Sequence, residues 1–394
     1  MRALVCGAGI AGLTLAWHLE RDGWDVELVE RAAGFRDGGY LIDFYGAGLR
    51  VAERMGLRPP LLQARCPVSG VRYVDRDGRR TGGLEMSGAL AEVVSLPRGV
   101  LARIVADGVR APVRYGTTVA AAEPRGDGVA VALSDGTERH VDLLVGADGA
   151  RSRVRRLVFG EEERFARYLG HHVAAYSVRD EDLGRRVGTR YQMLTVPGRM
   201  AGAYALPGGA VTLVFLRREP DPALPDDPGA ALQRHYGDLG WILPEALRRR
   251  PPSDHVYYDR ITQVEMDRWH RGRVVLLGDA CQAVSLFAGH GASMAMAGAW
   301  VLAAELRAAA GPSGLPPAAL DTALDAYERR MRPVIADVQR FGRRFVHWMA
   351  PGSRWRIAAR DGVLRLAALP GARRLLLRSL TPAGHDLVPA VPEE

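Results

Sequence analysis

The sequence predicts an α/β fold in which a parallel-sheet domain is interrupted by an antiparallel sheet and followed by helices. Residues 2–7 (RALVCG) and 274–277 (VVLL) are short, continuously apolar runs, typical of strands buried in a parallel sheet. Between them, residues 171–258 contain alternating apolar and polar runs separated by turn residues, typical of antiparallel strands. The two kinds of strand therefore belong to different domains.

The first apolar run begins a strand–helix–strand unit. Residues 10–21 have the pattern of a helix, and residues 24–30 (WDVELVE) form a second strand. Two strands and one helix within about thirty residues form the basic unit of a parallel sheet.

The middle of the chain changes character several times. VRYVDRDGRR, within residues 61–96, predicts a hairpin, and a helix is expected near residues 98–107. Two further strands flank the turn SDG, and YQMLTV, GAYALP and AVTLVFLRR read as antiparallel strands with one helix near residues 230–236. A long Ala-rich helix is expected over residues 292–307.

These changes predict three parts. The parallel-sheet domain comprises residues 1–72, 96–168 and 262–320, and the antiparallel-sheet domain, expected to bind the substrate, comprises residues 73–95 and 169–261. Residues 321–394 form a C-terminal helical segment. Its apolar residues recur at three- and four-residue steps and so share one helix face: Tyr327, Met331, Val334, Ile335, Val338, Phe341, Phe345 and Trp348.

Composition describes a globular protein with a substantial core. The chain has 394 residues, of which 47% are hydrophobic and 25% charged. Its three cysteines are scattered, without metal-ligand spacing, so we expect reduced thiols, no metal site and a cytoplasmic location. The apolar N-terminal run has no cleavage-like site, and no run is as long as a membrane span, so we expect no stable membrane insertion. The sequence leaves the oligomeric state open.

The positive charge does not indicate a nucleic-acid partner. The net charge is +8, yet all 53 basic residues are arginine, which points to nucleotide composition acting on codon choice. The arginines are dispersed, and no nucleic-acid-binding module is recognisable. Binding of anionic small molecules accounts for the charge equally well.

A glycine motif follows the first strand and opens the first helix. In Gly7-x-Gly9-x-x-Gly12, the first glycine permits a tight turn, the second lets a pyrophosphate approach and the third lets the helix pack close. An acid at the end of the next strand is placed to bind an adenosine ribose. The candidate cofactor-binding residues of this unit are Gly7, Gly9, Ile10, Ala11, Gly12, Glu30 and Arg31.

Two further motifs follow apolar strands. DGARSRVR begins at Asp148, and by itself is explained by a β-turn leading into a basic helix. GDACQAVSLFAGHGA contains Asp279 and a late glycine cluster, and by itself is explained by a strand-end turn and a helix cap.

Taken together, GAGIAG, DGARSRVR and GDACQAVSLFAGHGA resemble the three motifs of group A FAD-dependent aromatic-hydroxylase-type monooxygenases, the para-hydroxybenzoate hydroxylase fold family. Their order and spacing are similar to the family's over roughly residues 1–310. The resemblance implies a Rossmann-like FAD-binding domain interrupted by an antiparallel-sheet substrate domain, with C-terminal helices. It also explains why one chain carries two strand-to-glycine-turn elements, because a single extended FAD contacts both.

The resemblance assigns roles to individual residues. GAGIAG would hold the pyrophosphate, Glu30 the adenosine ribose and Asp279 the ribityl chain. Asp148 would act for both the flavin and the nicotinamide donor. Arg98 matches an arginine placed near the flavin phosphates, although a surface arginine at a helix start is the alternative. The amides of Gly289, Gly291 and Ala292 would face the pyrimidine edge of the flavin, where the positive end of the following helix favours the anionic reduced ring.

The third motif departs from the family pattern. Val284-Ser285-Leu286 replaces the usual prolines, Ser293 replaces asparagine and His290 replaces glutamine. His290 is a candidate catalytic residue that would stabilise the anionic flavin when protonated; the alternative is a neutral hydrogen-bonding substitute for glutamine.

A second candidate catalytic residue lies in residues 39–45 (GYLIDFY), where the family brings a loop beside the flavin. A buried Asp43 between aromatic residues would need hydrogen bonds; the alternative is an exposed loop acid. His171-His172 and Tyr191-Gln192 fall in the expected substrate sheet and are interpreted as structural.

The resemblance implies an FAD-dependent monooxygenase that uses NADPH or NADH and dioxygen to hydroxylate or epoxidise an electron-rich small molecule: an aromatic compound, a polyketide or another secondary metabolite. The alternative is a flavin-bound protein without oxygenase activity, either a cyclase or scaffold, or a reductase. A halogenase is disfavoured because the flavin-dependent halogenases need a lysine, and the chain has none.

Overall fold

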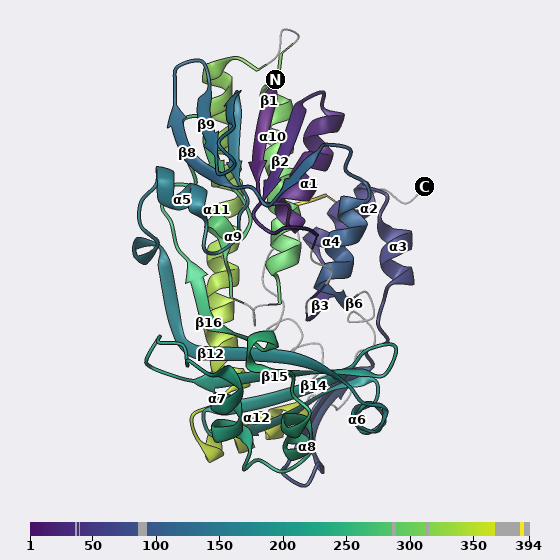
Figure 1. Cartoon of the computed structure of the whole chain (residues 1–394). Coiled ribbons are helices and arrows are strands. Elements are labelled where there is room, and N and C mark those ends of the chain that lie inside the picture. Colours follow the sequence, from purple (N-terminus) through teal and green to yellow (C-terminus); the bar gives the residue numbers. More distant parts are fainter. Residues whose placement is uncertain are drawn as a thin grey trace.

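A six-stranded sheet forms the centre of one lobe of the molecule (Figure 1). The computed structural model describes residues 1–35, 38, 40–85, 93–285, 289–311, 315–366 and 387–389. The strands, in spatial order, are β17 (His270–Arg271), β18 (Val274–Leu276), β11 (Leu143–Gly146), β1 (Arg2–Cys6), β2 (Asp25–Glu30) and β7 (Val113–Tyr115). All neighbours are parallel except β17 and β18.

This strand order brings three distant parts of the chain to one edge. β1 lies between β11 and β2, and β18 lies beside β11. The three motifs follow β1, β11 and β18 directly, and parallel strands end on the same side of a sheet. The pairing of these strands therefore gathers motifs about 140 and 270 residues from the first one.

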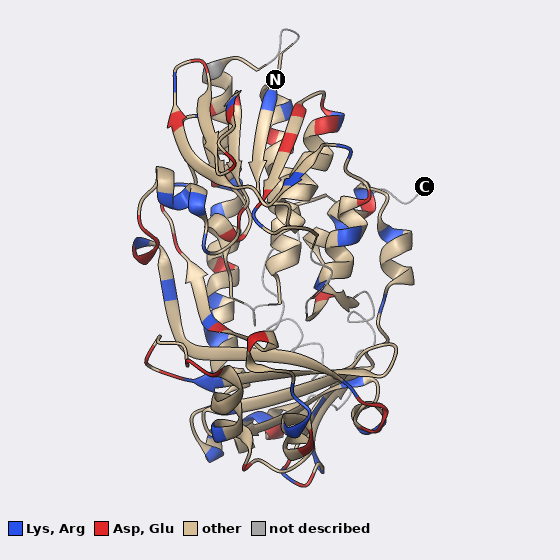
Figure 2. Ribbon diagram, in the orientation of Figure 1, with Lys and Arg blue, Asp and Glu red and all other residues tan. Residues whose placement is uncertain are grey.

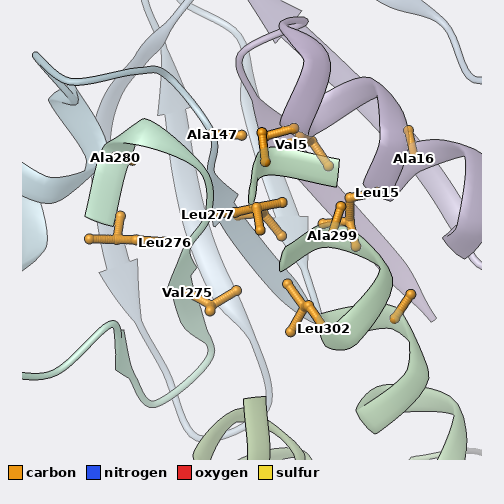
Figure 3. Close-up of a cluster of buried hydrophobic side chains, with 14 of the residues drawn as sticks. Val5, Leu15, Ala16, Ala147, Val275, Leu276, Leu277, Ala280, Ala299 and Leu302 are labelled. Carbon is orange, nitrogen blue, oxygen red and sulfur yellow. The ribbon is translucent and has the colours of Figure 1, made fainter. Parts of the chain in front are cut away.

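Helices and two small sheets surround the central sheet. α10 (Gly291–Ala309) packs against α1 (Ile10–Arg21), and Figure 3 shows Val5, Leu15, Ala299 and Leu302 among the buried apolar side chains of this region. The other helices of this lobe are α2 (Ala47–Arg54), α3 (Arg58–Gln63), α4 (Arg98–Ala106), α5 (Arg153–Val158) and α9 (Asp279–Gln282). The small sheets are β8 (Val119–Pro124), β9 (Val129–Leu133) and β10 (Glu138–Val141), and β3 (Leu41–Phe44) with β6 (Val94–Pro97).

The second lobe is a seven-stranded sheet. Its strands, in spatial order, are β16 (Tyr257–Val264), β12 (Ala166–Arg179), β15 (Ala210–Arg218), β14 (Arg199–Ala205), β13 (Arg190–Val196), β4 (Gly70–Val74) and β5 (Arg80–Glu85). The expected antiparallel strands and the β4–β5 hairpin are present. The sequence did not predict that the hairpin joins this sheet through a parallel pair, β13 with β4.

Helices cover this sheet and connect it to the first lobe. α6 (Glu181–Val187), α7 (Pro228–Tyr236) and α8 (Leu243–Arg248) belong to this lobe, and residues of all three join its apolar cluster. The 33-residue α11 (Pro317–Met349) runs along both lobes: Tyr327 and Met331 join the core of the first, and Val346 and Met349 pack on the second. α12 (Arg354–Leu366) follows and packs against β5 and β13. The predicted fold class is confirmed: the structure contains a mainly parallel sheet, a mainly antiparallel sheet and C-terminal helices.

The described C-terminal residues also contact the first lobe. Leu387 and Val388 are buried, and their carbonyl oxygens accept hydrogen bonds from the Arg330 and Arg50 side chains. Within the described ranges, we find no helix that is both long and apolar enough to cross a membrane.

Substitution of Gly12 tests the close approach of α1 to the glycine turn. A Cβ on this residue would lie 2.0 Å from the Gly7 carbonyl oxygen. Alanine inside a helix is normally preferred to glycine by roughly 0.5–1 kcal/mol, but we expect Gly12→Ala to lower the free energy of unfolding by roughly 1–3 kcal/mol because of this overlap. Urea denaturation measures the difference. Gly9→Ala is the control, since no atom lies within 4 Å of its Cβ position; equal losses in both variants would contradict the prediction.

Candidate active site

A cavity of about 770 Å³ lies between the two lobes. The first, second and third motifs all contribute to its wall, through Gly9, Asp148 and Asp279 respectively. Residues of the seven-stranded sheet line the rest. The three motifs therefore border a single site.

The glycine turn presents backbone to this cavity. Gly9, Ile10 and Ala11 line it, no side chain caps the start of α1, and the Cβ position of Gly9 faces open space. Uncapped amides at a helix start bind anions well. The turn therefore fits a phosphate group.

Gly7, Gly12 and Glu30 support this turn from behind the cavity wall. Gly7 has a φ of 111°, and its position is too crowded for a side chain. The Glu30 carboxylate accepts hydrogen bonds from the amides of Ala8 (3.1 Å) and Ala32 (2.8 Å). Glu30 is not among the residues that line the cavity, whereas its neighbour Arg31 is.

The Asp148 carboxylate is engaged with its own loop. One oxygen accepts a hydrogen bond from the Ser152 hydroxyl (2.5 Å), and the other accepts from the amides of Arg153 (2.7 Å) and Val154 (3.1 Å). Ser152 in turn caps α5. Asp148 thus fixes the start of this helix while its loop borders the cavity.

A buried arginine ties the second motif to the third. Arg155 is completely buried, and its guanidinium donates to the carbonyl oxygens of Ala280 (2.8 Å) and Ala150 (2.6 Å). Burial lowers the pKa of this guanidinium. Arg155, within DGARSRVR, has no role that the sequence could indicate. Both of its partners are backbone carbonyl groups, and one of them, that of Ala280, is 125 residues away.

Asp279 and Arg98 both line the cavity and attract each other electrostatically. Asp279 is exposed to the cavity but surrounded by protein, and this desolvation raises the pKa of its carboxyl, while Arg98 opposes the rise. Arg98 begins α4, and its amide donates to the carbonyl oxygen of Tyr40 (3.0 Å). Its guanidinium forms no hydrogen bond or ion pair with any residue that the structure describes. An unpaired guanidinium on a cavity wall suits an anionic ligand.

Asp43 lies on a strand and not in an exposed loop. One of its carboxylate oxygens accepts hydrogen bonds from Ser95 (2.5 Å), on the paired strand β6, and from the hydroxyl of Tyr191 (3.2 Å), on β13. Burial raises the pKa of Asp43 and, together with Asp43, raises that of Tyr191 well above its usual value. Asp43 and Tyr191 both line the cavity, so their hydrogen bond joins the lobes there. Gly39, at the start of the predicted segment, lies outside the described residues.

His290 is placed behind the cavity wall. It is buried at the start of α10, and its Nε2 lies 2.9 Å from the Tyr45 hydroxyl. Gly289, Gly291 and Ala292 line the cavity, as does Tyr45, but His290 is not among the lining residues. His290 therefore contacts Tyr45, which itself lines the cavity.

Ser293 supports the same tyrosine, because its hydroxyl donates to the Tyr45 carbonyl oxygen (2.9 Å). The departures at positions 290 and 293 therefore both position Tyr45. Of the unusual Val284-Ser285-Leu286 stretch, Leu286 lies outside the described residues.

The wall opposite the motifs is mainly apolar. Its apolar residues come from the seven-stranded sheet and α11: Val71, Val173, Met193, Met200, Val214, Ile261, Phe341, Phe345 and Met349. Tyr191, Tyr204 and Tyr257 add hydroxyl groups to this wall or to its rim. A mainly apolar wall with a few hydroxyls is typical of a small-molecule site.

His171 and His172, which the sequence placed in the expected substrate sheet, are buried in β12 and are not among the lining residues. Gln192 borders the cavity, but its side chain donates to the carbonyl oxygen of Val187 (2.8 Å). Tyr191, interpreted as structural, lines the cavity, and its hydroxyl donates a hydrogen bond to Asp43. Only the docking of the two lobes creates that contact.

The sequence matches the FAD binding domain family over residues 1–187 and 250–342. The chain belongs to this family. The family match stops at residue 187 and resumes at 250, and so omits three strands of the seven-stranded sheet, β13, β14 and β15.

Curated relatives of this flavoprotein cover most of its length. An uncharacterised protein of Mycobacterium tuberculosis is 36% identical over 319 residues, covering 78% of this chain and 85% of the relative. A flavin-dependent monooxygenase from an unknown prokaryotic organism is 29% identical over 355 residues, covering 87% and 88%. The 2-heptyl-3-hydroxy-4(1H)-quinolone synthase of Pseudomonas aeruginosa is 30% identical over 400 residues, covering 98% and 99%.

Solved structures share the fold of the flavoprotein. Tetracycline destructase Tet(55) superposes with a TM-score of 0.79 at 27% identity, covering 92% of this chain and 94% of that one. Klebsiella pneumoniae HpxO, in complex with FAD and uric acid, superposes with a TM-score of 0.79 at 22% identity, covering 96% of each chain.

These findings confirm the resemblance to FAD-dependent hydroxylases and the enzyme class. The protein is an FAD-dependent oxidoreductase of the flavin monooxygenase type. The cavity fits this cofactor, since an uncapped helix start, an unpaired arginine and a carboxylate border it together.

Gly9→Ala tests whether the cofactor approaches the glycine turn. The added methyl group would meet no protein atom, so we expect unchanged stability of the cofactor-free protein. It would occupy the space next to the uncapped amides, so we expect FAD to bind about tenfold more weakly or worse. Titration of cofactor-free protein with FAD, followed by flavin fluorescence, gives the affinity. Unchanged affinity would show that the cofactor does not approach this residue.

The raised pKa of Asp43 predicts a pH-dependent stability difference. Where a folded carboxyl has a pKa above its unfolded value, stability falls as pH rises through the interval between the two. We therefore expect Asp43→Asn to gain free energy of unfolding relative to the wild type as pH rises from about 4 to 8. Urea denaturation at several pH values measures the difference, with the exposed Asp267 as control through Asp267→Asn. A pH-independent difference would contradict the assignment.

Proposed function

We propose that the protein is a monooxygenase that uses NADPH or NADH and dioxygen to hydroxylate or epoxidise an electron-rich, mainly apolar small molecule. The observation that carries this proposal is the single cavity between the lobes. One side of it consists of the three motifs, and the other of apolar side chains with a few hydroxyls. A cofactor and an apolar substrate would meet there.

The motif side would hold FAD. Gly9, Ile10 and Ala11 would bind the pyrophosphate, and Arg98 would contact the phosphates. Asp279 would accept hydrogen bonds from the ribityl chain. When bound, FAD supplies the redox chemistry, taking electrons from a nicotinamide donor and delivering one oxygen atom of dioxygen to the substrate.

Two further groups would complete the cofactor site. Glu30 would support the turn beside the adenosine ribose, because its carboxylate accepts a hydrogen bond from the Ala8 amide behind the cavity wall. Gly289, Gly291 and Ala292 would present amides at the start of α10, where the helix dipole favours negative charge. Asp148 would act indirectly, by holding the loop that borders both the flavin and the nicotinamide donor.

The opposite side would exclude water and orient the substrate. Phe341 and Phe345, stacked with centroids 5.4 Å apart, and the methionines of the sheet offer an apolar surface to a flat ring system. Because the Tyr191 hydroxyl donates a hydrogen bond to Asp43, its oxygen can accept a hydrogen bond from a substrate hydroxyl or N–H group. Burial raises the pKa of Asp43, which makes its carboxylate a stronger proton acceptor.

The names of two similar proteins support a fused-ring or aromatic substrate. One is a hydroxyquinolone synthase and the other a tetracycline destructase. Both names refer to flat, polar-edged ring systems. The apolar wall with its three tyrosines suits such a molecule, so we propose an aromatic compound, a polyketide or a related secondary metabolite as the substrate.

The alternative function, a flavin-bound protein without oxygenase activity, is favoured by one observation. Ser285, in the segment that replaces the family's prolines, has a φ of 83°. Proline cannot adopt this angle, so the loop follows a path that a proline at this position would forbid. A cyclase, a scaffold or a reductase would tolerate such a change in the loop beside the flavin.

Isotope labelling separates these functions. FAD-loaded protein is incubated with NADPH or NADH, labelled dioxygen and a panel of phenols, quinolones and tetracyclines, and products are analysed by mass spectrometry. We expect one labelled oxygen atom per product molecule and substrate-dependent consumption of the nicotinamide. Nicotinamide oxidation without labelled product would indicate a reductase, and bound FAD with no consumption of nicotinamide or oxygen would indicate a scaffold.

A further inference from the structure

The last described helix, α12, exposes apolar side chains to solvent. In the part of the chain that the structure describes, seven large apolar side chains are exposed, and three of them lie on α12: Trp355, Val363 and Leu366. Trp355 (67% exposed) and Leu366 (61%) are the most exposed of the seven. The others are scattered over other elements, or border the cavity in the case of Tyr257.

These residues form one stripe along the helix. Trp355, Ala359, Val363 and Leu366 follow one another at intervals of four, four and three residues, which places them on the same face. Ala359 is exposed as well. At 1.5 Å per residue, the stripe from Trp355 to Leu366 is about 16 Å long.

The opposite face of α12 holds the helix on the protein. Arg360 and Leu364 are buried, and the Arg360 guanidinium stacks over the Tyr73 ring, 4.0 Å from its centroid. Arg360 also pairs with Asp361 (2.9 Å). The exposed stripe is therefore presented on a fixed support and is not needed to attach the helix.

Arginines flank the exposed stripe. Arg354 and Arg356 lie on either side of Trp355, and the Arg356 guanidinium is 5.3 Å from the indole centroid. Beside the start of the helix is an open hollow of about 480 Å³, lined by Arg76, Arg199 and Arg354. Figure 2 shows basic residues interspersed with acidic ones on this lower part of the second lobe. Asp238 pairs with Arg76 and Arg199, and the hollow remains predominantly basic.

We propose that α12 binds reversibly to the surface of an anionic lipid bilayer. A helix with tryptophan and leucine on its free face, flanked by arginines, lies in the plane of a membrane interface with its apolar face in the headgroup region. The arginines would contact lipid phosphates. This surface function is separate from the proposed oxygenase activity and does not depend on it.

Charge favours this partner over a second copy of the chain. In a symmetric dimer, the stripe of one copy would meet the stripe of another, and the interface would contain Arg354 and Arg356 of both copies. The net charge of +8 adds to this repulsion. An anionic bilayer offers an apolar environment to the stripe and negative charge to the arginines that flank it.

Vesicle flotation with the full-length, FAD-loaded protein tests the proposal. We expect binding to vesicles of phosphatidylglycerol and phosphatidylethanolamine, weak binding to phosphatidylcholine vesicles, and release at high salt. Trp355→Ser combined with Leu366→Ser should lower the partition coefficient about tenfold or more. Leu62→Ser, which removes an exposed leucine from α3, is the matched control and should bind normally.

A second pair of variants tests the charges. Arg354→Glu with Arg356→Glu should lower binding to anionic vesicles about tenfold or more, whereas Arg125→Glu, on the distant β8–β9 turn, should not. Circular dichroism and FAD content confirm that each variant is folded. Absence of binding to anionic vesicles, or equal losses in patch and control variants, would overturn the proposal. So would a wild-type dimer in solution that the stripe variants convert to monomers.

Discussion

The parallel pairing of β1 with β11, and of β11 with β18, is the constraint on which the rest of the site depends. These short strands are almost completely buried, and their register sets where each following loop begins. The first motif follows β1, the second follows β11 and the third follows β18. A change of register in any pair would separate the glycine turn from Asp148 and Asp279, which border the same cavity. Arg155 reinforces the arrangement by donating to the backbone of both later motifs.

The substrate side depends on a different interaction, the docking of the seven-stranded sheet on the first lobe. The hydrogen bond from Tyr191 to Asp43 crosses between the lobes, and so does the one from the Leu41 amide to the Tyr204 hydroxyl (2.7 Å). Both fix β3 against the sheet at the cavity wall. Burial at this junction raises the pKa of Asp43, whereas the hydrogen bonds from Ser95 and Tyr191 oppose the rise, so the structural connection and the proposed role of Asp43 rest on one group.

The sequence predicted most of the first lobe because its signals are local. A glycine pattern directly after an apolar strand identifies a turn at a helix start, and its geometry depends on neighbouring residues alone. Gly9 could be placed at the cavity in this way, whereas the role of Asp279 was implied by the resemblance of its motif to that of the family. The environments of Asp43 and His290 could not, since both depend on partners far along the chain. Ser95 is 52 residues from Asp43, and Tyr45 is 245 residues from His290. Tyr191 was assigned a structural role for the same reason.

The sequence by itself determined the fold class, the three cofactor motifs and the separation of parallel from antiparallel strands. Periodicity and turn chemistry act over a few residues and are visible in a single sequence. Only the tertiary structure decided that Asp148 serves its own helix, that His290 supports Tyr45 from behind the wall and that α12 leaves an apolar stripe in solvent. Those features depend on which face of each element meets a neighbour, and that is fixed by packing between segments remote in sequence.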